Sequence, residues 1–279
     1  MASSSSAETA KTVLTTGANS GIGLATALAV ARKGYHSVGS VRSAAKANVV
    51  KTAAKAAGVD VETVLLDVTD PERSEEVIDQ LKPWGLVNNA GYGMTGAIED
   101  VGEDEARALF DTMVMAPMRL CRLAIPHQRQ AGEGRIVNMS SIFGLTSFPL
   151  VGWYAGAKHA LEALSDAMRV EVAGDGIKVV LVEPGGIKTN IWDDLNSDLE
   201  RRSGSRFEGA YRRSLSGTRL TAPLMGSPDQ VAKAVVRGLT SRIPQDRYLV
   251  GWDARAGSLF ERLTPTAVRD IAGRLGLGI

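Results

Sequence analysis

Residues 12–23 read TVLTTGANSGIG, and this stretch decides the fold. A short apolar and β-branched run, residues 12–16, leads into a glycine-rich turn, and a helical pattern begins near Gly21. Glycine has no Cβ, so the backbone there can approach a pyrophosphate closely. The free N–H groups and positive dipole end of a helix N-terminus attract phosphate. The stretch therefore predicts a nucleotide site; the alternative is a tight turn with a purely structural role.

The glycines of this loop are spaced Gly-x3-Gly-x-Gly, which differs from the commoner Gly-x-Gly-x-x-Gly. A bare glycine triplet is weak evidence, and the strand before it and the helix after it give it weight. The loop residues expected to contact the nucleotide are Gly17, Asn19, Ser20, Gly21, Ile22 and Gly23.

The segment after the second apolar run bears on the choice of cofactor. An NAD site carries an acid roughly 20 residues after the loop, where the acid binds the ribose 2′-hydroxyl. Residues 38–43 read VGSVRS, with no acid and with Arg42 instead. Because a guanidinium can pair with a 2′-phosphate through two hydrogen bonds, we expect NADP(H). The alternative is that Arg42 is a solvated loop charge.

Outward from the loop, short apolar runs alternate with longer helical patterns. This alternation predicts βαβ units and an α/β fold, a Rossmann-like doubly wound parallel sheet. A proline in the longest helix, Pro117, is expected to kink it. The expected strands are residues 12–16, 36–41, 61–66, 84–88, 135–140, 178–183 and 248–250, and the expected helices are residues 21–33, 43–57, 71 onward, 103–126, 153–173 and 229–240.

The domain layout follows from the order of these motifs. At about 150 residues per domain, 279 residues suggest two domains. The motifs thread a single sheet, however, so we expect one domain over residues 11–279 after a disordered lead-in, residues 1–10. Residues 190–226 hold a stretch rich in Arg, Ser, Gly and Glu with apolar anchors, which predicts a substrate-binding lid.

A tyrosine and a lysine four residues apart, Tyr154 and Lys158, are expected to share one face of a helix. A tyrosine with a pKa near 10 is a poor acid or base at pH 7, and a nearby ammonium lowers that pKa. The pair alone could be an ordinary surface pair. It gains weight from Ser141, which follows the fifth expected strand, because doubly wound folds bind ligands at the carboxyl ends of strands.

The motifs together resemble a known family. In type, order and spacing, residues 16–23, residues 88–91 (NNAG), Ser141, Tyr154 with Lys158, and residues 184–185 (PG) match the short-chain dehydrogenase/reductase family. The match is to its branch of roughly 250 residues, a length that folds as one domain. Residues 141–144 and 158–162 look most like the 17β-hydroxysteroid and retinol dehydrogenases of that family.

The resemblance implies a role for each matching residue. Tyr154 would protonate a carbonyl oxygen or deprotonate an alcohol, Ser141 would hydrogen-bond that oxygen, and Lys158 would bind the nicotinamide ribose and lower the tyrosine pKa. Asp67 could instead be an acid at a helix start, and Asn88 is interpreted as structural. The implied cofactor contacts beyond the glycine loop and Arg42 are Asp67, Val68, Asn89, Ala90, Gly91, Tyr154, Lys158, Pro184, Gly185, Ile187 and Thr189.

One position departs from the family pattern. Family members usually place an asparagine in the long helix after the fourth strand, and here residues 110–113 (FDTM) put Met113 there. A thioether cannot donate a hydrogen bond, so it cannot replace an asparagine that holds a water. Either the proton takes another path or catalysis is impaired. The second case would make the chain a regulatory NADP(H)-binding protein.

Apolar residues are expected around the nicotinamide, which suits a hydrophobic ketone or secondary alcohol. The resemblance to steroid and retinol dehydrogenases points the same way, but a fold does not fix a substrate. Several of these side chains could be ordinary core. The expected substrate contacts are Phe143, Phe148 and Trp192, with Met94, Ile142, Leu150, Trp153, Ile187, Leu195, Leu199, Phe207 and Tyr211 around them.

Composition mainly excludes function classes. There are 32 Lys and Arg against 31 Asp and Glu, which gives no electrostatic footprint for nucleic acid. A single cysteine, Cys121, rules out an intrachain disulfide, and three scattered histidines show no metal-ligand spacing. No apolar run is long enough to span a membrane, and the N-terminus lacks secretion signals, so a cytoplasmic protein is expected.

These observations predict an NADP(H)-dependent carbonyl reductase or alcohol dehydrogenase that acts on hydrophobic ketones, with no metal. An epimerase or dehydratase of the same superfamily is disfavoured by the glycine spacing. The resemblance implies a homodimer or homotetramer.

Overall fold

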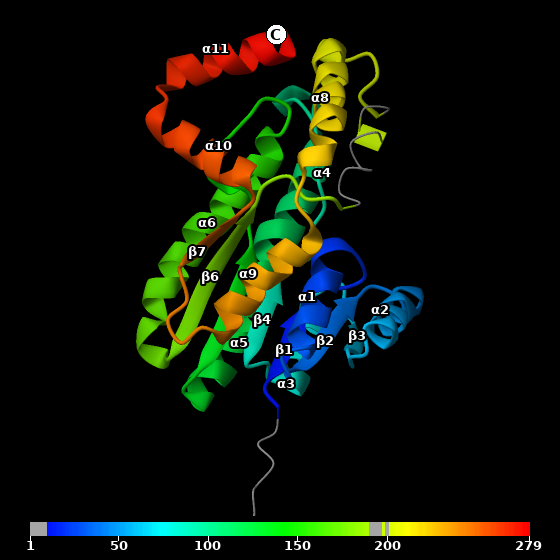
Figure 1. Cartoon of the computed structure of the whole chain (residues 1–279), viewed down its shortest axis with the longest axis vertical. Helices are drawn as coiled ribbons and strands as arrows, with labels where there is room; N and C mark the ends of the chain where they lie inside the picture. Colours follow the sequence, from blue (N-terminus) through cyan, green and yellow to red (C-terminus); the bar gives the residue numbers. More distant parts are fainter. Residues whose placement is uncertain (1–9, 190–196, 199–200) are drawn as a thin grey trace, which may run out of the picture.

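A parallel sheet of seven strands forms the centre of the computed structural model, which describes residues 10–189, 197–198 and 201–279 (Figure 1). The strand order is β3-β2-β1-β4-β5-β6-β7. Strands β1 to β3 are added toward one edge of the sheet and β4 to β7 toward the other, so the strand order reverses between β1 and β4. Ligands of doubly wound sheets bind outside the carboxyl ends of strands at such a point. The strands are β1 Thr12–Thr15, β2 His36–Val41, β3 Glu62–Leu65, β4 Gly85–Asn88, β5 Gly134–Met139, β6 Ile177–Pro184 and β7 Arg247–Val250.

Helices cover both faces of this sheet because successive strand residues point to opposite sides. Leu14 and Leu86 pack with α3 (Pro71–Leu81), α5 (Ala116–Ala131) and α6 (Gly152–Glu171). Their neighbours Val13 and Val87 pack on the opposite side with α1 (Gly21–Ala31) and α9 (Pro228–Thr240), and α2 (Ala44–Ala56) packs beside α1. The predicted Rossmann-like fold is confirmed.

The longest expected helix, residues 103–126, differs from its prediction. It runs as α4 (Glu103–Phe110), a π-helical turn (Asp111–Met115) and α5, which ends at Ala131 beyond Pro126. Pro117 has no N–H to donate to the preceding turn, and a π-helical turn just before it accommodates the lost bond. The irregularity lies where Pro117 predicts it, but the predicted end at Pro126 is wrong.

Three C-terminal helices lie beyond the carboxyl edge of the sheet (Figure 1). They are α8 (Glu208–Thr221), α10 (Trp252–Leu263) and α11 (Thr266–Leu277), and α8 packs against α11. Tyr211 of α8 is 2% exposed, and its hydroxyl donates to Asp100 at 2.6 Å and accepts from the Ala97 N–H at 2.7 Å. This side chain therefore anchors α8 to the body of the protein. Short 3₁₀ turns occupy Ile98–Asp100, Ile142–Gly144, Ala173–Asp175 and Ala222–Leu224.

Some predictions fall outside the described residues. They are most of the lead-in, residues 1–9, and the part of the expected lid at residues 190–196, 199 and 200, which includes Trp192, Leu195 and Leu199. Within the part that is described, no helix has both the length and the hydropathy needed to cross a bilayer.

Candidate active site

A cavity of about 1120 Å³ lies at the carboxyl edge of the sheet and brings the predicted residues together. Every residue predicted to act in catalysis or to bind the cofactor lines it. The wall is built from the segments that follow six successive strands, β1 to β6, and from one face of α6. Residues as far apart in sequence as Gly17 and Asp253 thus meet in one place.

The glycine loop is shaped so tightly that two of its positions require glycine. Gly17 and Gly21 have φ of +66° and +50°, a region that L side chains rarely adopt. A Cβ at Gly23 would lie 2.2 Å from the Gly17 carbonyl oxygen, so any other residue would push the loop open. The Ser20 side chain makes no capping bond to α1, and the first turn of α1 holds no acid. The loop therefore fits a pyrophosphate at the helix N-terminus.

Hydrogen bonds to the segment that follows β4 hold the start of the glycine loop in place. The Thr16 hydroxyl accepts from the backbone N–H groups of Asn89 and Ala90, both at 2.9 Å, and the Asn89 amide donates to the Thr16 carbonyl oxygen at 2.9 Å. Asn88 is buried and donates to Asn138 of β5 at 2.8 Å, which agrees with its structural interpretation. These bonds hold the floor of the cavity rigid.

Two cations, Arg42 and Lys46, line the far end of the cavity beside Asp67. Arg42 is exposed at the end of β2, and Lys46 lies in the first turn of α2. Asp67 Oδ1 accepts from the N–H and hydroxyl of Thr69 at 3.0 and 2.7 Å, and these bonds lower the pKa of Asp67. The cap of α3 is Asp70, so Asp67 is not the capping acid of that helix.

At the opposite end Ser141 and Tyr154 meet. Ser141 is 8% exposed, and its Oγ accepts from the Phe143 N–H at 3.2 Å, which fixes the hydroxyl above the end of β5. The Phe143 ring packs edge-on against the Tyr154 ring at a centroid distance of 6.1 Å. Both hydroxyls therefore lie on one wall, where a single carbonyl oxygen could reach them.

Lys158 lies one helical turn after Tyr154, as expected, but its ammonium points elsewhere. Nζ donates to the Met139 carbonyl oxygen at 2.8 Å and lies 5.7 Å from the centre of the Tyr154 ring. Burial raises the pKa of Tyr154 to about 12 and lowers the pKa of Lys158 to about 8. In this arrangement the Ser141 hydroxyl, and not Lys158, opposes the effect of burial on the pKa of Tyr154. The lowering of that pKa by Lys158 stays a prediction.

Met113 lies inside the π-helical turn and lines the cavity. It is 3% exposed, and its Cε would lie 2.8 Å from a Cβ on Gly91. The helix is thus distorted here with a thioether in place of an amide. The distortion follows from Pro117 and the local packing and does not require an asparagine.

The expected substrate residues divide into three groups. Phe143 lines the cavity, as do Met94, Ile142 and Ile187. Phe148 does not: it is 45% exposed and packs near Gly273 of α11, so the structure places it outside the cavity. Trp192 lies outside the described residues. Leu150, Trp153, Phe207 and Tyr211 also do not line the cavity, because they pack against neighbouring elements as ordinary core.

Sequence reasoning missed several wall residues. Asp253 accepts from the Gly186 N–H at 2.5 Å and so holds the loop after β6. Nothing near it in sequence indicates this contact, since α10 begins some 70 residues after that loop. Lys46 could have been noticed as a second cation after Arg42. Other missed residues include Tyr92, Thr95, Thr218, Thr221, Leu224, Met225 and Trp252.

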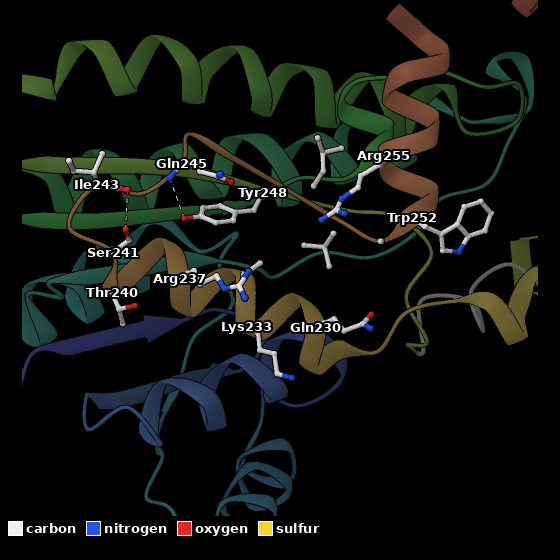
Figure 2. Close-up of a pocket in the computed structure, with 14 residues that line it drawn as sticks. Gln230, Lys233, Arg237, Thr240, Ser241, Ile243, Gln245, Tyr248, Trp252 and Arg255 are labelled. Carbon is white, nitrogen blue, oxygen red and sulfur yellow. Dashed lines mark hydrogen bonds between the residues drawn. The ribbon is translucent and has the colours of Figure 1, made fainter.

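A second hollow, of about 750 Å³, runs along the outer edge of the sheet between α9, β7 and the start of α10 (Figure 2). Figure 2 shows the side chains of Arg237 and Arg255 entering the space between α9 and α10. No predicted site residue that the structure describes lines this hollow. The described residues also contain no cluster of His, Cys, Asp or Glu that could hold a metal ion.

The sequence was compared with known proteins. The family model of the short chain dehydrogenases matches residues 11–200. The Bacillus subtilis oxidoreductase YusZ is 33% identical over 264 residues, which cover 91% of this chain and 94% of that protein. Retinol dehydrogenase 7 of Rattus norvegicus is 31% identical over 231 residues, which cover 75% of this chain and 72% of that protein.

The solved structures that resemble this chain include short-chain dehydrogenases as well. A short-chain dehydrogenase from Streptomyces avermitilis has 32% sequence identity and a TM-score of 0.78, with 98% of both chains covered. A structure from Beutenbergia cavernae, described as an NAD(P)-dependent gluconate 5-dehydrogenase with NADP bound at low occupancy, has 27% identity and a TM-score of 0.72, and the match covers 88% of this chain and 97% of that one.

Proposed function

The chain belongs to the short-chain dehydrogenase family, and from this premise we propose that it transfers a hydride between NADP(H) and a hydrophobic ketone or secondary alcohol. One observation carries the proposal. Ser141, Tyr154 and Lys158 line the same cavity as the glycine loop, at the carboxyl edge of the sheet. That arrangement places an acid and an oxygen-binding hydroxyl beside a dinucleotide site.

The cofactor, when bound, supplies or accepts the hydride at its nicotinamide ring. The glycine loop and the α1 N-terminus would hold its pyrophosphate, and the segment from Pro184 to Thr189 would flank its nicotinamide. Asp253 would keep that segment in place through Gly186. These residues bind and orient; none of them needs to change its protonation state.

The proton step is assigned to Tyr154. Since burial raises the pKa of Tyr154 to about 12, the phenol is protonated at neutral pH and can donate to a carbonyl oxygen. Ser141 would donate a hydrogen bond to the same oxygen and so stabilise negative charge there. Lys158 would contribute positive charge near the phenolate that forms. The phenol of Tyr154 is therefore in the form that the reduction of a carbonyl requires.

The choice of NADP(H) rests on Arg42 and Lys46. Both cations line the end of the cavity that the ribose of the adenosine half would reach. A 2′-phosphate there would gain charge-assisted hydrogen bonds, each worth about 1.5–3 kcal/mol. The Beutenbergia cavernae structure is described as NAD(P)-dependent and holds NADP at low occupancy, so it supports a nicotinamide cofactor, and the choice of NADP(H) rests on the two cations.

The hydrophobic substrate is inferred from the other end of the cavity. Its wall there includes Met94, Ile142, Phe143, Leu224 and Met225. A wall of this kind excludes water and favours apolar ketones. The similarity to a retinol dehydrogenase supports the same substrate class.

A screen of NADPH oxidation tests the proposal. The purified chain is offered steroids, retinoids, quinones and aryl ketones, with NADPH and NADH in parallel. We expect turnover with at least one apolar ketone, a lower KM for NADPH than for NADH, and loss of turnover in Tyr154→Phe. NADPH binding without turnover of any carbonyl would support the regulatory alternative instead.

A further inference from the structure

Two buried carboxylates lie behind the catalytic wall, and the proposed mechanism does not use them. Glu162 is on α6, one helical turn after Lys158, and Glu183 is in β6, directly before Pro184. Glu162 is 5% exposed and Glu183 is fully buried. Burying an ionised carboxylate is costly unless its charge is paired and its oxygens are hydrogen-bonded. A buried pair of them requires an explanation.

A single guanidinium, that of Arg247 in β7, contacts both carboxylates. Its Nη2 lies 3.2 Å from Glu162 Oε2 and its Nε lies 3.1 Å from Glu183 Oε1. Within the described chain, Glu162 Oε1 and both Glu183 oxygens make no well-aligned hydrogen bond, although Arg247 Nε lies close to Glu183 Oε1 and the Ser140 hydroxyl lies beside Glu162. The same Nη2 lies 2.6 Å from Asp166, so one guanidinium contacts three carboxylates. Two ionised glutamates would therefore leave negative charge at Arg247 unpaired.

Lys158 faces Glu162 from the active-site side, and the other charged groups around the pair are more exposed and bind one another and Arg247. Asp166 of α6 lies 2.6 Å from Arg247 Nη2 and 2.8 Å from Arg169 Nη2, and Asp246, in the turn before β7, lies 3.6 Å from Arg169 Nε. The 3₁₀ turn packed on Glu162, Ile142–Gly144, carries no charge. The inner pair therefore depends on Arg247 and on whatever protons it holds itself.

Charge on Glu162 matters to the active site through Lys158. The lysine is 5% exposed, and burial lowers its pKa to about 8 while the Glu162 carboxylate opposes that fall. Burial and the neighbouring Glu162 raise the pKa of Glu183 to about 8. The raised pKa of Glu183 and the effect of an ionised Glu162 on Lys158 both agree with a pair in which Glu183 is protonated more readily than Glu162.

We propose that Glu162 and Glu183 share one proton, and that the single negative charge left on the pair, mainly on Glu162, keeps the Lys158 ammonium charged in the working enzyme. The shared proton bridges oxygens that otherwise make no well-aligned hydrogen bond, and the remaining charge matches that of Arg247. Glu162 and Glu183 are thus positioning residues that act through Lys158. The part of the inference that concerns turnover rests on the proposed function, and the shared proton does not.

The two isosteric substitutions are expected to move the pH profile in different ways. Glu162→Gln leaves the charge on Glu183, away from the lysine, so the pKa of Lys158 falls and activity is lost at a lower pH. We expect the alkaline limb of kcat to shift down by about one unit. Glu183→Gln leaves the charge on Glu162, so the alkaline limb stays in place or shifts up. If the two glutamates had a purely structural role, the alkaline limb of kcat would shift equally in Glu162→Gln and Glu183→Gln, and that result would overturn the proposal.

Asp166→Asn is the matched control, because Asp166 contacts the same guanidinium but is partly exposed and two helical turns from Lys158. Its alkaline limb is expected to match that of the wild type, and a downward shift equal to that of Glu162→Gln would count against the pair. Thermal unfolding and NADPH affinity of each variant show whether it is folded.

Infrared difference spectroscopy tests the shared proton without turnover. At pH 7 the wild type should show the carbonyl stretch of a neutral carboxylic acid, and either glutamine variant should lose it because a lone carboxylate beside Arg247 is ionised. Absence of the band from the wild type would overturn the shared proton. If no substrate is turned over, only the proposed function fails, and the infrared result still stands.

Discussion

The two ends of the active-site cavity are built in different ways. The cofactor end is made of short segments that directly follow β1, β2, β3 and β4, and the sheet fixes their positions. The substrate end is made of side chains from the turn after β5, the loop after β6, α8 and the start of α10, which are far apart in sequence. Backbone geometry therefore defines one end, whereas side chains from segments far apart in sequence define the other. Substitutions should affect binding of the cofactor and of the substrate separately.

The largest effect is expected where the two ends meet, at Tyr154. Tyr154→Phe removes the proposed acid and should lower kcat by about 10²- to 10⁴-fold, the usual worth of general acid catalysis. The Kd for NADPH, measured by fluorescence titration, should change little. A variant that keeps more than about half of the wild-type kcat would place the acid elsewhere.

A methyl group in the glycine loop should weaken binding of the cofactor and leave the substrate end of the cavity unchanged. Gly23→Ala puts a Cβ 2.2 Å from the Gly17 carbonyl oxygen, and overpacking of this kind costs about 1–3 kcal/mol. We expect the Kd for NADPH to rise at least about tenfold.

The matched control for Gly23→Ala is Gly217→Ala in α8, where a Cβ meets nothing within 4 Å. It should leave the Kd unchanged and raise the melting temperature slightly, since alanine favours a helix. Equal effects of the two substitutions would show that the loop does not hold the pyrophosphate.

Arg42→Ala should separate the two nicotinamide cofactors. Loss of a charge-assisted contact to a 2′-phosphate should raise the KM for NADPH by about ten- to a hundredfold and leave that for NADH unchanged. Lys51→Ala, which removes an exposed cation of α2 outside the cavity, is the control. A preference of the wild type for NADH would contradict the assignment.

At the substrate end, Trp252→Ala should raise the KM for a bulky apolar ketone by several-fold to about tenfold, as expected for loss of a few kcal/mol at most from a partly exposed aromatic side chain. NADPH affinity should not change. Phe148→Ala is the control, because Phe148 is also partly exposed but lies outside the cavity. If Phe148→Ala has the larger effect, the described wall is not the substrate wall.

The smallest effect is expected at Met113, which borders both ends. Since the π-helical turn is already present with methionine, Met113→Asn should leave kcat and its pH profile within about twofold of the wild type, below about 0.4 kcal/mol. A large gain in kcat would show instead that methionine limits proton transfer.

The difference between the two ends of the cavity also explains how much of the fold and site could be predicted from the sequence. The glycine loop, Asn89 and Ser141 follow strands directly and Pro184 ends β6, so their spacing in sequence fixes their place at one edge of the sheet. Tyr154 lies in the first turn of α6 and is predicted from its spacing to Lys158. The fold and most of the cofactor end could be predicted for these reasons, although sequence reasoning missed Lys46.

The substrate end could not be predicted from spacing. Phe148 and Tyr211 are as apolar or aromatic as Phe143, yet only Phe143 reaches the cavity, because tertiary packing decides which of such side chains are core. Asp253 contacts Gly186 across a large sequence separation, and no local pattern records that contact. The direction in which Lys158 points, and with it the raised pKa of Tyr154, depends on burial that only the folded structure supplies.

The central claim is that a hydride passes from NADPH held at one end to a ketone held at the other. It is tested most directly by incubating the wild type with an apolar ketone and NADPH that carries deuterium at nicotinamide C4. Mass spectrometry should find deuterium on the carbinol carbon of the product alcohol, and Tyr154→Phe should form almost none of this product. NADPH consumed without deuterium in an alcohol product would contradict the account.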